Sequence, residues 1–172
     1  MYIIDEGPVL DCMFRDVTLI DGTGADPILH ANVLVQGGKI AAISPRQDSE
    51  QLWCKEDPGL TVIPSDGMYL LPGLMDAHLH VHGYAKTDPT VVKLWHLTTN
   101  PTMKFFHAVK NLSLLLEAGF TAVRHCGIMT YDLDNCVRDA VAAELFPGPR
   151  VLTCGHDISM TAGHGDLFTP PW

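Results

Sequence analysis

The sequence predicts an α/β protein in two parts: a small antiparallel β unit over residues 1–71, and alternating strands and helices over residues 72–172. Two observations carry this prediction. Short β-rich runs separated by Gly, Asp and Pro fill residues 12–71. From residue 74 onward, β runs alternate with segments whose apolar residues recur at helical spacing, which is typical of βαβ units and a parallel sheet.

Turn residues mark out the first part. Its predicted strands are residues 14–20, 32–36, 39–43, 61–63 and 68–71. Gly37-Gly38 predicts a tight hairpin between the second and third of these strands. Residues 44–59 are polar and contain two prolines, so they are predicted as a loop.

The second part begins with a strand at residues 74–81. Further strands are predicted at 120–124 and 150–153, and helices at 102–118 and 132–145. Gly119 is placed as a helix stop, and Asp132 or Asp134 can cap the second helix. Val137, Val141 and Leu145 are expected on one face of that helix.

Composition narrows the class of protein. Apolar residues make up 47% of the 172 residues and charged residues 18%, as in ordinary globular proteins. The net charge of −9, with scattered acidic residues, disfavours a nucleic-acid partner. No apolar run is long enough for a membrane span, and the first residues lack the features of a secretory signal. Five cysteines without CxxC spacing favour reduced thiols in a cytoplasmic protein.

The segment that carries chemistry is Asp-Ala-His-Leu-His-Val-His, residues 76–82. Side chains alternate along a strand, so two faces are predicted. One face holds Asp76, His78, His80 and His82, and the other, packed against helices, holds Met75, Ala77, Leu79 and Val81. Two imidazoles two residues apart can reach one ion, and imidazole suits zinc. By itself His-x-His is a weak signal, and the alternative is a polar strand face in solvent.

Longer motifs give a resemblance. Leu71-Pro-Gly-Leu-Met-Asp-Ala-His-Leu-His80 resembles the first barrel strand of the amidohydrolase superfamily. Gly37-Gly38-Lys39-Ile40 resembles a hairpin in the N-terminal β-sandwich of its imidazolonepropionase-like branch, and residues 117–124 resemble that branch's second barrel strand. Residues 147–152 and 159–166 resemble the third strand and its loop, and are similar to those of Xaa-Pro dipeptidases and ochratoxinase-type amidases.

The resemblance implies an incomplete (β/α)₈ TIM-type barrel. About the first three βα units would lie in residues 72–172, after a β-sandwich portion in residues 1–71, with the site at the C-terminal ends of the strands. His78 and His80 would bind one of one or two divalent ions, zinc among them. A metal-activated water would attack the carbonyl of a small amide or dipeptide. His164 would contact the substrate, the alternative being a structural loop histidine, and Asp166 would cap that loop.

The sequence also departs from the family pattern. An aspartate usually follows the Val-Arg pair of the second strand, whereas this chain has His125-Cys126. His125 either lines the site or fills space, and we expect the second. His82 would lie behind the ligands or face solvent, and two histidines outside any motif, His96 and His107, would be surface or packing residues.

The family's bridging lysine, later histidines and catalytic aspartate belong to later strands and find no match before Trp172. No catalytic residue is therefore predicted. One hypothesis is an amidohydrolase of which this chain is a truncated, inactive N-terminal portion. The other is a non-catalytic fragment or association module. Among enzymes, a deaminase or cyclic-amide hydrolase competes with a dipeptidase, and a homo-oligomer stays open. An in-frame continuation carrying the missing residues would favour the first hypothesis.

Overall fold

The computed structural model describes residues 10–45, 53, 59–84, 88–127, 132–156, 158–160 and 163. The chain divides into two compact units, Met1–Pro72 and Gly73–Trp172, and each is described by itself. Among the described residues, none of the helices has the length and apolar character that a membrane span requires.

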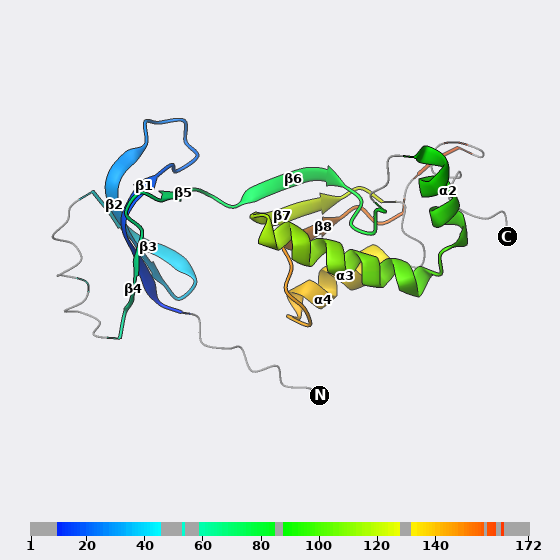
Figure 1. The fold of residues 1–172 in the computed structure, drawn as a ribbon. Helices are drawn as coiled ribbons and strands as arrows, with labels where there is room; N and C mark the ends of the chain where they lie inside the picture. The colour runs from blue at the N-terminus through cyan, green and yellow to red at the C-terminus, as the bar shows by residue number, and fades with distance from the viewer. Residues whose placement is uncertain are drawn as a thin grey trace. The chain divides into compact units, whose positions relative to one another are not determined.

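The first unit is a five-stranded mixed sheet (Figure 1). Its strands are β1 (Cys12–Leu19), β2 (Ile28–Gln36), β3 (Lys39–Ser44), β4 (Thr61–Pro64) and β5 (Tyr69–Leu70). The order is β3-β2-β1-β4, and β5 also pairs with β1. The Gly37-Gly38 hairpin is confirmed: both glycines have positive φ, 55° and 73°, and Gln36 pairs with Lys39.

The prediction that this unit is antiparallel is wrong for its last two strands. β1, β2 and β3 pair antiparallel, but β4 and β5 both run parallel to β1. A parallel neighbour needs a long connection, because the chain must return to the same end of the sheet. The sixteen or so residues between β3 and β4 are long enough to make that return.

The second unit is a three-stranded parallel sheet, in the order β6-β7-β8, with three helices. Its elements are β6 (Leu74–Leu79), α2 (Pro89–Thr98), α3 (Pro101–Glu117), β7 (Phe120–His125), α4 (Leu133–Ala142) and β8 (Arg150–Thr153). Figure 1 shows α3 and α4 on the same side of the sheet. The core between them and the strands is built on Val81, Ala108, Leu112, Val123, Val137 and Val151.

Helix α2 was not predicted. Its start has the same local chemistry as the start of α3. Asp88 accepts a hydrogen bond from the Thr90 amide and is followed by Pro89, and Asn100 accepts one from Thr102 and is followed by Pro101. A capping side chain followed by proline favours a helix start, because proline lacks the amide hydrogen that would be unsatisfied there.

The two predicted helices are confirmed, with one changed boundary. Gly119, at φ 91°, follows the end of α3 and donates to the Leu116 carbonyl, as a C-terminal stop does. α4 ends at Ala142, so Leu145 lies beyond the helix and is 68% exposed rather than on its buried face. Asp132 occupies the N-cap of α4 without a side-chain capping bond. Asp134 is buried and accepts the Gly155 amide, which ties the chain after β8 to this helix.

Gly73, where β6 begins, lies against Thr121 of β7. A Cβ atom at Gly73 would overlap Oγ1 and Cγ2 of Thr121. We expect Gly73→Ala to lower the free energy of unfolding by about 1–3 kcal/mol, because overpacking forces the strands apart. Urea unfolding measures this effect.

Thr121→Ala provides the control. Alone it should cost little, since Thr121 is exposed. Combined with Gly73→Ala it should recover only part of the loss, because the Thr121 Cβ would still lie 2.6 Å from the new Cβ. Strictly additive single and double variants would show that the two residues are not in conflict.

Candidate metal centre

The C-terminal end of β6 brings His78 and His80 together. His78 is the second-last residue of the strand and His80 follows its end. Their ring centres are 5.7 Å apart and the rings are nearly perpendicular, at 83°. Two imidazoles bound to one tetrahedral zinc through nitrogens at about 2.0–2.1 Å would have their ring centres about 5 Å apart. The pair therefore fits one ion after a small rotation of either ring.

His80 is held in the tautomer that a ligand needs. Its Nδ1 lies 3.2 Å from the carbonyl oxygen of Gly127, which only accepts hydrogen bonds. Nδ1 must then carry the hydrogen, and the lone pair of the neutral ring is on Nε2. Metal-binding histidines commonly donate their other nitrogen to a carbonyl in this way.

The predicted alternation along β6 holds only in part. The register shifts between Leu74 and Met75 and again between Asp76 and Leu79, and between these shifts Asp76 pairs with Val123, a core residue packed against the helices. Asp76 accordingly faces α3, and its carboxylate accepts the His78 amide at 2.9 Å. Met75 pairs with Ala122 and is 75% exposed rather than packed against helices. A register shift in pairing reverses the face of the residues that follow.

A cavity of about 520 Å³ lies on this α3 side of β6. Its wall includes Asp76, Leu79, His80, Val81, Gly83, Tyr84, Asn111, Leu114 and Leu115. The Asn111 side-chain amide donates to the carbonyls of Val81 and Gly83, at 2.8 and 3.0 Å. These two bonds fasten the chain after His80 to α3, and so fix one side of the candidate site.

His82 is buried, which excludes solvent, one of the two places that the sequence left open for it. Its exposed fraction is 0%, and its ring lies against Trp95 and His96 of α2, with ring centres 6.5 and 5.3 Å away. Within the described part of the chain, neither of its ring nitrogens has a hydrogen-bond partner. Burial, reinforced by the nearby His125, His96, Lys104 and His80, lowers the pKa of His82 from 6.5 to about 3. The ring is therefore neutral at physiological pH.

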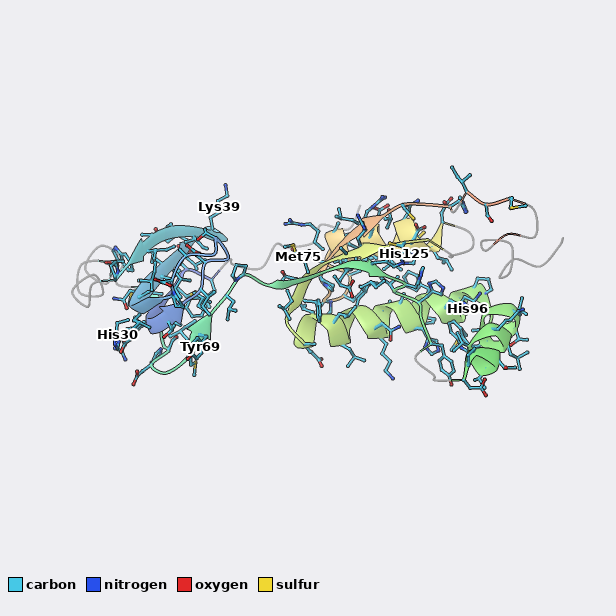
Figure 2. All side chains as sticks on the ribbon, turned by 90° about the horizontal axis from the view of Figure 1, so that it is seen from above. His30, Lys39, Tyr69, Met75, His96 and His125 are labelled. Carbon is cyan, nitrogen blue, oxygen red and sulfur yellow. The ribbon has the colours of Figure 1, made fainter. Side chains whose placement is uncertain are left out.

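His125, labelled in Figure 2, is buried on β7. Its ring centre is 5.9 Å from that of His80 and 5.7 Å from that of His82. Its Nδ1 accepts the backbone amide of Val81 at 3.2 Å. In the neutral ring the hydrogen is then on Nε2, which leaves no lone pair for a metal. This geometry disfavours His125 as a third ligand.

His96, His107 and Lys104 hold α2 in place. Trp95 stacks on Tyr84 at 5.3 Å, and His96 and His107 lie edge-on to Trp95, so both histidines are packing residues. Buried Lys104 donates to the carbonyl of His96 at 2.8 Å, near the end of α2, where a cation is favourable. Burial lowers the pKa of Lys104.

His164 and Asp166 lie outside the described residues. Among the residues that the structure does describe, no three His, Cys, Asp or Glu side chains are gathered closely enough to hold a metal ion. The predicted pair, His78 and His80, therefore falls one ligand short of a catalytic zinc site, which usually has three protein ligands.

The low pKa of His82 predicts how stability depends on pH. The unfolded chain takes up a proton on this histidine near pH 6.5, whereas the folded chain does so only near pH 3. His82 therefore leaves stability unaffected above pH 6.5, and makes the fold progressively less stable as pH falls from 6.5 toward 3. The full difference in the free energy of unfolding is about 5 kcal/mol.

His82→Leu removes this dependence. We expect its free energy of unfolding to exceed that of the wild type increasingly below pH 6.5, as measured by urea unfolding from pH 7.5 to 4. His30→Leu, at an exposed site in the other unit, is the matched control. Parallel curves for wild type and His82→Leu would mean that folding does not lower the pKa of His82.

Comparison with known proteins places this arrangement in a family. The profile of the amidohydrolase family matches residues 69–167. Ochratoxinase from Aspergillus niger is 26% identical over 153 residues, which are 89% of this chain and 30% of that protein. N-acyl-D-aspartate deacylase from Alcaligenes xylosoxydans xylosoxydans is 32% identical over 90 residues, which are 52% of this chain and 16% of that protein.

Solved structures agree. A prolidase complexed with N-methylphosphonate-L-proline superposes with a TM-score of 0.74 at 25% identity, over 94% of this chain and 35% of that one. The structure of A. niger ochratoxinase superposes with a TM-score of 0.71 at 24% identity, over 95% and 35%. The chain spans about a third of the length of these relatives. Because the family profile covers more than half of the sequence, and includes β6, β7 and β8, the chain belongs to the amidohydrolase family.

Proposed function

We propose that the protein carrying this sequence is a metal-dependent hydrolase of C–N bonds in small amides or dipeptides, and that His78 and His80 bind its metal. The observation that carries the proposal is the pair of imidazoles at the C-terminal end of β6, 5.7 Å apart, with His80 presenting Nε2. Zinc is the ion we propose, since two imidazoles suit it. When bound, such an ion supplies Lewis acidity toward a carbonyl and lowers the pKa of water.

The substrate class is proposed from the names of the relatives. A deacylase of N-acyl-D-aspartate and a prolidase bound to a proline phosphonate both point to an amide bond next to an amino acid. We also propose that residues 72–172 are the first βα units of a (β/α)₈ barrel and that residues 1–71 are part of a β-sandwich. In such a barrel the site lies at the C-terminal ends of the strands, which is where His78 and His80 lie. His164, in the segment after β8, is our proposed substrate contact.

Hydrogen bonds hold the two proposed ligands and the chain that follows them. His80 is oriented by the Gly127 carbonyl, and Asp76 holds the amide of His78. Asn111 fastens the chain that follows His80. Preorganised ligands lose less freedom when an ion binds, which strengthens binding without adding a contact.

Metal binding tests the ligands directly. We expect His78→Ala and His80→Ala each to weaken Zn²⁺ binding to the 172-residue chain by about tenfold or more, because each removes one ligand. Loss of a residue that merely orients a ligand already costs about 10–100-fold in affinity. Isothermal titration measures the affinity, and His107→Ala in the aromatic cluster is the matched histidine control. Equal affinities in all four proteins would rule out this ligand pair.

Turnover tests the completeness of the centre. We propose that residues 1–172 alone bind Zn²⁺ weakly and do not measurably hydrolyse N-acyl amino acids or Xaa-Pro dipeptides. The reason is that two ligands fall short of three, and that no general acid–base group is assigned here, a loss typically worth about 10²–10⁴-fold. Stoichiometric, tight zinc together with turnover that His78→Ala abolishes would show that this chain is a complete enzyme.

A further inference from the structure

Two residues at and just after the end of β7 contact His80: the buried His125 and Gly127. We propose that His125 is a positioning residue for His80: its Nδ1 holds the Val81 amide, and this contact keeps the Gly127 carbonyl on His80 Nδ1. A role for His125 in metal binding rests on the proposed function, in which His80 binds the metal. The contacts of His125 with Val81, and of His80 with Gly127, need no metal.

The first step concerns the backbone. The β6–β7 pairing ends at Leu79 and His125, where the Cys126 amide donates to the Leu79 carbonyl at 3.0 Å. Two residues further along, the Val81 amide has a side-chain acceptor, the Nδ1 of His125, at 3.2 Å. The imidazole thus extends the contact between the two chain segments past the last backbone pair.

The second step concerns His80 itself, which lies between these two points. Its ring is perpendicular to that of His125, with centres 5.9 Å apart, and its Nδ1 meets the carbonyl of Gly127, two residues after His125. The backbone on either side of His80 and the acceptor for its ring therefore all depend on residues 125–127. A shift of Val81 away from His125 would move His80 relative to Gly127.

The third step separates this role from space filling. His125 is fully buried, so no solvent can replace its acceptor. Leucine would fill a similar volume but offers nothing to the Val81 amide. Asparagine is smaller, yet its Oδ1 occupies nearly the place of Nδ1 and can accept the same bond. If His125 only fills space, His125→Leu should preserve the site better than His125→Asn. If His125 positions His80, His125→Asn should preserve it better.

Histidine nitrogen NMR tests the proposal without any metal. In the ¹⁵N-labelled chain at pH 7.5, we expect long-range ¹H–¹⁵N spectra to show the Nε2–H tautomer for His125 and the Nδ1–H tautomer for His80. In His125→Asn the tautomer of His80 should persist, and in His125→Leu it should become mixed. A wild-type His125 in the Nδ1–H form would overturn the proposal, and so would a His80 that His125→Leu leaves unchanged.

Zinc binding provides the second readout. We expect His125→Leu to weaken Zn²⁺ affinity by about 10–100-fold, the usual effect of losing a contact that orients a ligand. His125→Asn should stay within about threefold of the wild type. Circular dichroism checks that both variants fold. Weaker Zn²⁺ binding in His125→Asn than in His125→Leu would overturn the positioning role. If the wild type binds no zinc, the proposed function fails, but the wild-type tautomers still decide this inference.

Discussion

The register of β6 against β7 is the constraint on which the candidate site depends. Parallel pairing runs from Leu74–Phe120 to Leu79–His125, with register shifts between Leu74 and Met75 and between Asp76 and Leu79. With this register Asp76 lies on the α3 side of β6, while His78 and His80 lie together at the strand end. The same register places His125 beside His80, and the Gly127 carbonyl at His80 Nδ1. One pairing pattern therefore sets both the ligands and their support.

Helix α2 gives the site its electrostatic character. It covers His82, and the resulting burial keeps that imidazole neutral. Lys104 is close enough to contribute to the low pKa of His82 and of His96, so a positive charge already lies behind the cluster. A metal ion beside His82 and His96 would be repelled by this charge, whereas an ion at His78 and His80 would lie toward the end of β6. The arrangement therefore favours His78 and His80 as ligands, and His82 and His96 as packing residues.

Local patterns predicted most of the elements. Alternating β-formers, and the helical spacing around Ala108 and Leu112, involve residues only a few positions apart, and the elements predicted from them are present. The parallel direction of β4 and β5 depends on pairing between distant segments, about which a single strand's residues say nothing. The shift within β6 is of the same kind, because it arises from how β6 meets β7. Helix α2 differs, since Asp88-Pro89 was a usable signal in the sequence.

The three histidines in alternate positions show why the end of a strand matters more than the motif. Alternation places side chains on one face only while the backbone stays extended. β6 ends at Leu79, and the chain then turns, with the Gly83 amide donating to the His80 carbonyl at 2.8 Å. A Cβ at Gly83 would lie 2.9 Å from that oxygen, so the turn needs glycine. The turn carries His82 toward Trp95 and His96 instead of along the line of His78 and His80. His82 is thus removed from the ligand face by the chain's own bend, which the spacing of histidines alone could not reveal.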